Sequence, residues 1–221
     1  MKDNLKELLR VRNLGNNEAA LYFYGEIVSS WWEAWDNSDK YPEAIRRFLD
    51  GLKGETLHIY VNSPGGAVFA GMAIYNMLSR YAGKKIVHID GIAASIASVI
   101  AMAGDEIVMP SNTLLMIHKA IASAAGNSDE MLHFAELLAK VDESILSVYS
   151  KRLKNAAELE RVRALVAAES YLTAEEAAGL FAGVNITGPI EMAACAKRDA
   201  AAIFAAAMEA ECLKLLELRK I

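Results

Sequence analysis

The chain has 221 residues, of which 54% are hydrophobic and 23% charged, and its formal net charge is -5. This length suits one large domain or two very small ones, and a single domain of this size buries roughly 70% of its unfolded surface without disulfide bonds. The hydrophobic content excludes disorder over most of the chain, and the acidic balance disfavours a general nucleic-acid binder.

The cysteines and the apolar segments of the sequence indicate the cellular compartment in which the protein works. Cys195 and Cys212 lie in an alanine-rich stretch with no metal-ligand spacing, so we expect no disulfide framework and a reducing compartment. The first residues lack the apolar segment of a secretory signal. The longest uncharged apolar run, Gly91 to Gly104, is shorter than the ~20 residues of a membrane span, so we predict a buried element. A cytoplasmic protein with no membrane role is the expectation.

The N-terminal part of the chain combines a polar arm with an aromatic region. Residues 1–18 are charged and rich in Asn, and we predict an N-terminal arm there. Residues 20–24 are aromatic and aliphatic and end at a glycine, which predicts a strand followed by a turn. The three tryptophans, Trp31, Trp32 and Trp35, come next; they favour a hydrophobic clamp, with ligand stacking as the alternative.

The remaining pattern alternates strands with helices. Pro42 begins a stretch with apolar residues at helical spacing, which predicts an amphipathic helix over 42–52. Further strands are predicted at 56–61, 86–89, 106–109, 113–117 and 183–186, and further helices at 68–81, 93–103, 128–153, 156–168, 174–179 and 190–221. Thr173, which is followed by acidic residues in the next turn, is expected to cap the helix at 174–179. This alternation predicts an α/β domain with a largely parallel sheet over 19–188, followed by a C-terminal helical extension over 189–221.

A Pro-Gly-Gly turn joins the strand at 56–61 to the next helix. Gly65 and Gly66 permit positive φ and close approach of a ligand to the backbone. Backbone N–H groups at such a turn, near the start of a helix, suit an anion. A tight connector without function explains the turn equally well.

Ser95 stands where a glycine-led turn enters the very apolar stretch that we predict to be a buried helix. Its hydroxyl could cap that helix, or it could be a nucleophile with the next N–H ready to hold an oxyanion. Small residues at positions 93, 94 and 97 would leave room for a substrate backbone. Ser98 is the competing hydroxyl, but it lies one turn further along and is expected to pack inside.

His118 follows the apolar strand predicted at 113–117. An imidazole there could serve an exposed serine as general base, because its unperturbed pKa lies near neutrality, although a structural role is the alternative. His58 and His88 fall within predicted strands and His133 on a long helix, so these three fit a catalytic role less well.

Three ordered motifs carry a resemblance to a known family. Asn62-Ser63-Pro64-Gly65-Gly66, Gly91-Ile92-Ala93-Ala94-Ser95 and Met116-Ile117-His118 resemble those of the Clp protease proteolytic subunit, the ClpP-like serine peptidases. The sequence around these motifs, over roughly 19–186, is most similar to that of ClpP-like enzymes encoded near capsid genes in tailed phages and prophages. The resemblance implies a ClpP/crotonase-like spiral of repeated ββα units, with a projecting handle helix at 128–153.

The resemblance also implies a serine peptidase with a Ser-His-acid triad. It assigns the nucleophile to Ser95, the general base to His118 and the acid to Glu169. Family members usually carry Asp at the third position. Glu can orient and stabilise an imidazolium, because a triad is defined by geometry and role, but its longer side chain changes the fit. Asp142 is a lesser candidate for the acid.

Further site residues follow from the same resemblance. The backbone N–H groups of Gly66 and Ile96 match the oxyanion hole, where the loss of one donor typically costs ~3 kcal/mol of barrier. The substrate-binding residues it implies are Gly65, Gly66, Lys119 and Ala120. No metal or nucleotide cofactor is expected, and the chain carries no phosphate-binding Gly-x-x-x-x-Gly-Lys loop.

One departure from the family bears on function. After His118, family members usually continue with a polar residue, Pro and a Gly-Gly pair, whereas here residues 119–126 read Lys-Ala-Ile-Ala-Ser-Ala-Ala-Gly. Ring stacking or the substrate path could therefore differ. The sequence favours a homo-oligomeric serine endopeptidase of the phage type, acting on capsid or scaffold proteins.

Several alternatives remain beside this function. The chain could be a Clp-type subunit that works with an AAA+ unfoldase, or a catalytically inactive ring protein. It could also be a hydratase or isomerase of the same fold, which would not need the pair of Ser95 and His118. A membrane-linked Ser-Lys peptidase is the weakest option.

Overall fold

In the computed structural model of the protein, the described residues are 17–29, 41–54 and 56–189. The chain divides into two units, residues 1–188 and 189–221, and all that follows concerns the first. Most of the predicted N-terminal arm, the three tryptophans and the predicted C-terminal helix lie outside the described residues.

The described residues form one seven-stranded sheet. Its main path runs β1 (Glu18–Tyr24), β2 (Thr56–Ser63), β3 (Lys85–Ala94), β4 (Glu106–Pro110) and β7 (Val184–Thr187), all neighbours being parallel. β5 (Leu114–Ile117) pairs in parallel with the second half of β3, and β6 (Ser170–Thr173) pairs antiparallel with β5. The predicted α/β class with a largely parallel sheet is confirmed.

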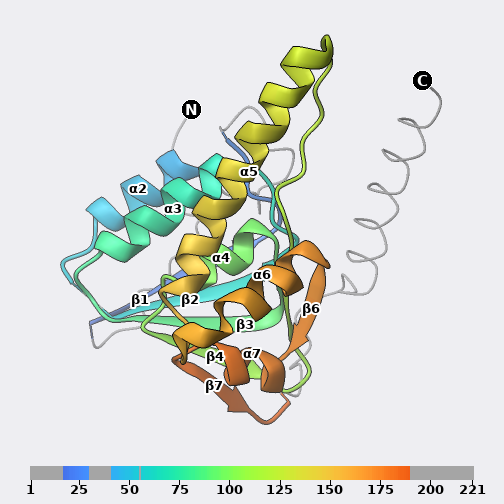
Figure 1. The fold of residues 1–221 in the computed structure, drawn as a ribbon. Coiled ribbons are helices and arrows are strands. Elements are labelled where there is room, and N and C mark those ends of the chain that lie inside the picture. The colour runs from blue at the N-terminus through green and yellow to red at the C-terminus, as the bar shows by residue number, and fades with distance from the viewer. Residues whose placement is uncertain (1–16, 30–40, 55, 190–221) are drawn as a thin grey trace. The chain divides into compact units, whose positions relative to one another are not determined.

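Helices connect these strands and cover the sheet (Figure 1). They are α2 (Pro42–Asp50), α3 (Val68–Arg80), α4 (Ile96–Ala101), α5 (Ser128–Ser150), the 3-10 turn η2 (Ala156–Glu158), α6 (Leu159–Ala167) and α7 (Ala174–Leu180). Each predicted helix within the described residues is present, with shifted ends in several cases. The predicted cap of α7 is also present, because Thr173 and Glu176 form a reciprocal capping box.

The core lies where the inward face of the sheet meets the helices. Along β2 every second residue is buried, and the buried apolar set Leu57, Ile59 and Val61 belongs to the same core as Ile74 and Leu78 of α3. Period-two alternation of this kind is the mark of a strand with one covered face. The sequence of β2 therefore places its last inward residue, Ser63, inside the protein.

The apolar run around Ser95 differs from the prediction. Ala93 and Ala94 belong to β3 and pair with β5, so the buried helix starts only at Ile96 and is six residues long. Gly91 lies within the same strand and not in a turn, and a Cβ there would come within 2.6 Å of the Asn62 Oδ1. A short, fully apolar segment satisfies a buried strand and a buried helix equally well, so periodicity alone could not separate them.

Two local features were not predicted. Asn127, the residue before α5, accepts the N–H groups of Asp129 and Glu130 with its side chain, and the Glu130 carboxylate accepts the Asn127 N–H in return, so a reciprocal capping box begins this helix. β6 was not predicted because its four residues alternate only weakly and precede a strong helix start. Its pairing with β5 is a tertiary contact between residues 53 to 59 positions apart.

α5 extends away from the sheet, and the segment 118–127, which has neither helix nor strand, runs beside it (Figure 1). A hydrogen bond from the Ala120 N–H to the Asp142 carboxylate, 2.8 Å long, ties the two together. In the described part of the chain, no helix combines the length and hydropathy needed to cross a membrane.

Candidate active site

Ser95 occupies the sharp turn between β3 and α4. Its backbone has φ 55° and ψ -128°, a conformation that is sterically unfavourable for any residue with a Cβ. Its N–H donates to the Met116 carbonyl at 3.0 Å, so the turn is attached to β5. Such a turn carries the serine side chain out of the line of the strand, with the next helix starting immediately behind it.

β5 brings His118 to this turn. The pairing of Ala94 with Met116 sets the ends of β3 and β5 side by side, and His118 is the residue just beyond Ile117, where β5 ends. The His118 Nε2 lies 2.6 Å from the Ser95 Oγ, and both side chains are half-buried. The sequence predicted this pair, and the structure brings its two members into hydrogen-bonding contact.

The hydrogen bond also indicates which tautomer suits the pair. A neutral imidazole has one N–H donor and one acceptor nitrogen. If the Ser95 hydroxyl donates to Nε2, then the proton of His118 resides on Nδ1. This is the arrangement in which an imidazole can accept the hydroxyl proton, while an acid is needed on the opposite side of the ring.

Glu169 is opposite His118 in the strand register but does not contact it. β5 and β6 pair Ile117 with Ser170, so one further step along the ladder sets Glu169 across from His118. Glu169 is exposed, with φ 52°, and within the described ranges no hydrogen bond or ion pair joins its carboxylate to the histidine. The strand register thus brings the predicted acid to the level of His118, without a hydrogen bond between the two side chains in the described structure.

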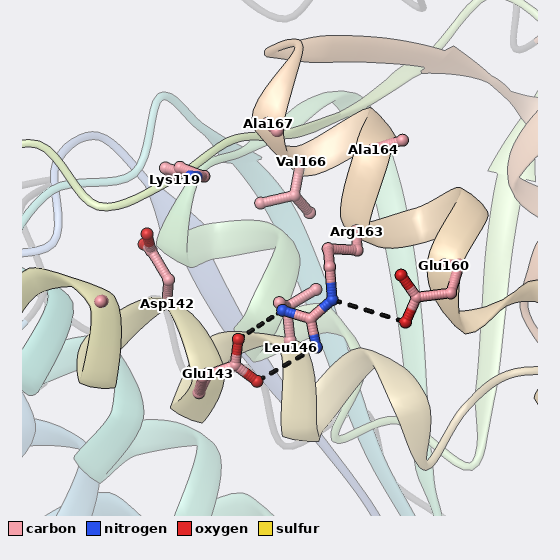
Figure 2. A pocket seen from close by; sticks show the side chains of 10 residues that line it. Lys119, Asp142, Glu143, Leu146, Glu160, Arg163, Ala164, Val166 and Ala167 are labelled. Atoms are coloured by element: carbon pink, nitrogen blue, oxygen red, sulfur yellow. Dashed lines mark hydrogen bonds and ion pairs between the residues drawn. The ribbon is translucent and has the colours of Figure 1, made fainter.

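Asp142, the other candidate acid, has a different partner. Its Oδ1 accepts a hydrogen bond from the Ala120 N–H. Ala120 is one of the predicted substrate-binding residues, and its N–H is therefore not available to bind a substrate. Asp142 and the exposed Lys119 line a cavity of about 360 Å³ between α5 and α6. Figure 2 shows the carboxylate of Asp142 in this cavity, with Lys119 beside it.

The same cavity contains an ion-pair cluster. Arg163 of α6 forms an ion pair with Glu143 and a second with Glu160, 3.7 Å long, as Figure 2 shows. The Arg163 guanidinium lowers the pKa of the Glu143 carboxyl through a hydrogen bond. Because all three groups are at least partly exposed to water, the cluster connects the two helices with little net energy.

The Gly65–Gly66 turn packs directly against Ser95. Both residues have positive φ, 103° and 139°. A Cβ on Gly65 would lie 2.6 Å from the Ser95 Cβ, and one on Gly66 would lie 2.1 Å from the Ile27 carbonyl oxygen. Only glycine satisfies both the backbone conformation and the space, so Gly65 follows from close approach to the Ser95 turn and Gly66 from close approach to the Ile27 backbone.

Ser63 fixes this turn from inside, a contact that we did not predict. Its fully buried hydroxyl donates to the Gly25 carbonyl at 2.6 Å and accepts the Gly65 N–H at 3.2 Å. The signal was present in the sequence, because Ser63 continues the inward-facing series of β2 as its one polar member. A buried polar group at the end of an apolar series needs partners, and here those partners shape the turn.

Two backbone N–H groups near Ser95 are free. Within the described part of the chain, neither the N–H of Gly66 nor that of Ile96 donates a hydrogen bond to a protein acceptor. The Ile96 N–H is the first of α4 and has no partner within that helix. Both groups therefore meet the first requirement for binding an oxyanion.

The remaining hydroxyl and histidine candidates lie elsewhere. Ser98 is fully buried, as predicted, and has no access to substrate. His58 and His88 lie on β2 and β3 and contact one another, with 2.9 Å between the His58 Nδ1 and the His88 Nε2, and His133 is exposed on α5. Among the described residues, no group of three or more His, Cys, Asp or Glu is arranged to hold a metal ion.

A serine hydroxyl within hydrogen-bonding distance of an imidazole, as in the pair of Ser95 and His118, is one part of the catalytic arrangement of serine peptidases. A family model described as Clp protease matches residues 47–184. The ATP-dependent Clp protease proteolytic subunit of Ligilactobacillus salivarius (strain UCC118) is 32% identical over 143 residues, covering 62% of this chain and 71% of the relative. The protein of the same description from Chlorella vulgaris is 31% identical over 124 residues, covering 55% of this chain and 60% of the relative.

The chain belongs to the Clp protease family, and it is a serine-type endopeptidase. The predicted ClpP-like resemblance is thereby confirmed for the family. The match begins within α2 and ends in β7, so it includes the three motifs that carried the resemblance.

Proposed function

We propose that Ser95, His118 and Glu169 cleave peptide bonds through an acyl-enzyme. The 2.6 Å contact between the His118 Nε2 and the Ser95 Oγ is the observation that carries this proposal. His118 takes the hydroxyl proton as the Ser95 Oγ attacks the peptide carbonyl carbon. The carbonyl oxygen becomes an oxyanion, which the N–H groups of Gly66 and Ile96 stabilise.

The intermediate then collapses and is hydrolysed. His118 gives its Nε2 proton to the leaving amine as the C–N bond breaks, which leaves an ester on Ser95. A water molecule, deprotonated by His118, attacks that ester. The proton returns to the Ser95 oxygen, the acid product leaves, and the enzyme is restored.

We assign to Glu169 the role of orienting His118. Its position opposite the histidine in the ladder supports this assignment, and so does its freedom, because among the described residues its carboxylate has no other hydrogen-bond partner. In this role the Glu169 carboxylate would accept a hydrogen bond from the His118 Nδ1–H. Apo hydrogen bonds of catalytic groups are often long and tighten only when substrate binds.

The substrate would lie as an extended peptide between the Gly65–Gly66 turn and the segment after His118. The close approach of the glycine turn to Ser95 supports one side of this path. On the other side, Lys119 is exposed, while Ala120 offers its carbonyl and methyl group because Asp142 holds its N–H.

The biological setting that we propose is a phage-type protease that matures capsid or scaffold proteins in the cytoplasm of a bacterium or an infected host. The departure of residues 119–126 from the usual segment of the family, together with the resemblance to phage-encoded enzymes, supports this role. The alternative is a Clp-type subunit served by an AAA+ unfoldase, which is favoured by the printed names of the relatives.

Assembly into a homo-oligomeric ring is part of the same proposal. Large apolar side chains are exposed on the first half of α5 and beside it, namely Met131, Leu132, Leu137 and Ile121. A cluster of this kind is typical of a contact surface. Light scattering of the purified chain should give a multiple of the protomer mass, and a stable monomer would contradict the ring.

The test of the nucleophile is labelling with a fluorophosphonate probe. The parent should take up the label, and Ser95→Ala and His118→Ala should lose it, because the first removes the attacking oxygen and the second its base. Ser144→Ala, which changes an exposed serine on α5, is the matched control and should label like the parent. Label that survives Ser95→Ala would overturn the assignment.

A second measurement separates the two biological roles. A maturation protease should cleave an unfolded protein such as carboxymethylated casein without nucleotide, and the rate should not change when ATP and an AAA+ unfoldase are added. The alternative role requires both additions before a folded protein is degraded. Degradation of a folded protein only in the presence of unfoldase and ATP would refute the maturation role.

A further inference from the structure

A chain of buried hydrogen bonds lies directly behind the Ser95 turn. The Ser98 Oγ lies 2.6 Å from the Ser95 carbonyl oxygen and 2.8 Å from the Tyr149 hydroxyl oxygen. Ser98 and Tyr149 are 0% and 1% exposed, so neither can reach substrate or bulk water. A buried polar pair of this kind is expected to be fully bonded, and here both hydroxyls are.

The direction of the chain follows from the acceptors. A carbonyl oxygen can only accept a hydrogen bond, so the Ser98 hydroxyl donates its single hydrogen to the Ser95 carbonyl. The hydrogen between Ser98 and Tyr149 must then come from the tyrosine. Burial raises the pKa of Tyr149, so this phenol keeps its proton. The order is therefore Tyr149 to Ser98 to the Ser95 carbonyl.

This carbonyl shares a peptide plane with the proposed oxyanion donor. The Ser95 C=O and the Ile96 N–H belong to one trans peptide unit and point in opposite directions. Whatever holds the oxygen therefore aims the N–H. The same oxygen also accepts the Ser98 backbone N–H at 3.0 Å, so Ser98 donates two hydrogen bonds to the Ser95 carbonyl. The strained φ and ψ of Ser95 favour rotation of this plane, which the two bonds oppose.

We propose that Ser98 and Tyr149 are positioning residues that aim the Ile96 N–H at the oxyanion of the Ser95 reaction. The inference rests on the proposed function, because it needs Ser95 as nucleophile and Ile96 as oxyanion donor. Two hydrogen bonds on the carbonyl also polarise the peptide unit and make its N–H a stronger donor. Through Tyr149, the orientation of this peptide depends on the packing of α5, whose Asp142 also holds the segment after His118.

The test compares Ser98→Ala, Tyr149→Phe and the double variant with the parent, using a fluorogenic peptide. Removal of one oxyanion-hole donor typically lowers kcat 10²–10³-fold. In Ser98→Ala the Ile96 N–H is still present but poorly oriented, so we expect a smaller fall in kcat, of about tenfold. Tyr149→Phe should show a smaller fall, and KM should stay within about twofold in both. The double variant should resemble Ser98→Ala, since both hydroxyls act through one carbonyl.

A control separates positioning from ordinary stability. Thr113→Val removes another buried hydroxyl bonded to a carbonyl, at 2.8 Å from the Pro110 oxygen and outside the site. It should lower the thermal midpoint as the test variants do, yet keep the parent kcat. The affinity of a peptide aldehyde, whose hemiacetal places an oxygen in the oxyanion hole, should fall in parallel with kcat in the test variants alone.

The outcomes are distinct. If Tyr149→Phe and Ser98→Ala keep the parent kcat and the parent affinity for the aldehyde, the inference is wrong. If Ser98→Ala does not fold, the kcat of Tyr149→Phe alone tests the inference. This variant is expected to fold, because it removes one oxygen atom and keeps the aromatic ring. A parent that takes no fluorophosphonate label at Ser95 would overturn the proposed function itself.

Discussion

Ser95 combines a strained backbone with a short contact to His118. A residue held in such a sparsely populated conformation costs on the order of 1–3 kcal/mol, so the surroundings must hold it there. The described structure supplies that restraint through the Ser95 N–H bond to Met116 and the two bonds from Ser98 to the Ser95 carbonyl. Strain that is maintained in this way is typical of a site whose geometry matters more than local stability.

The proposed acid can be tested against its rival. Glu169→Gln should lower kcat by about 10²- to 10⁴-fold, because the amide cannot stabilise an imidazolium, and Glu169→Asp should recover part of that loss. Steady-state peptidase kinetics measure both effects. Glu175→Gln, which changes an exposed carboxylate in the first turn of α7, is the control and should behave like the parent. If Asp142→Asn were inactive and Glu169→Gln active, the acid would be Asp142.

α3 and α4 contact one another through a glycine. A Cβ on Gly71 would lie 2.1 Å from the Ile96 Cγ1, so α3 approaches α4 as closely as its backbone allows. Because Ile96 is the first residue of α4, this contact also locates the N–H proposed for the oxyanion hole. Helix packing and site geometry therefore depend on the same pair of residues.

Gly71→Ala should accordingly reduce both stability and activity. The added methyl group must displace a buried isoleucine, and overpacking of this kind typically costs about 1–3 kcal/mol. Denaturant unfolding and peptidase assays measure the two effects. Gly179→Ala is the matched control, because nothing lies within 4 Å of its added Cβ, and it should be neutral or stabilise α7 by up to about 1 kcal/mol. Equal stability and activity in both variants would contradict the contact.

The protein as a whole should lose stability in acid through His88. Burial, and to a smaller extent the neighbouring His58, lowers the pKa of His88 from 6.5 to about 4. Between these pH values the unfolded chain binds the proton and the folded chain does not. This contribution to stability is therefore complete above pH 6.5 and is lost progressively as the pH falls toward 4.

Denaturant midpoints at pH 7 and pH 4.5 check this prediction. His88→Phe should flatten the dependence, whereas His133→Gln, a change at an exposed histidine, should not. Asp90 acts in the opposite sense, because burial raises the pKa of its carboxyl, which favours the folded state as the pH falls. Tyr60, whose ring centroid lies 4.7 Å from that of His88, remains neutral throughout this range. An identical pH dependence in the parent and in His88→Phe would refute the role of this histidine.

Periodicity and local chemistry were sufficient for much of the fold. The alternating strands, the amphipathic α2 and the Thr173 cap are local patterns of side chains, and all were predicted with small errors at their ends. The motifs around Gly65, Ser95 and His118 were sufficient for the family, because glycine at positive φ and residues at strand ends recur at fixed local spacing. The same local patterns led us to predict helix at the end of β3. In a fully buried segment every residue is apolar, so the spacing of apolar residues does not distinguish a strand from a helix.

The arrangement of the site depended on long-range packing. The pairing of β3 with β5 sets His118 against Ser95, and the pairing of β5 with β6 sets Glu169 across from His118. The bond between Ser98 and Tyr149 joins residues 51 positions apart and has no signature in either segment. A sequence pattern records which face of an element is buried. Which neighbours meet on that face is decided by strand register and helix packing, and these exist only once the whole chain has folded.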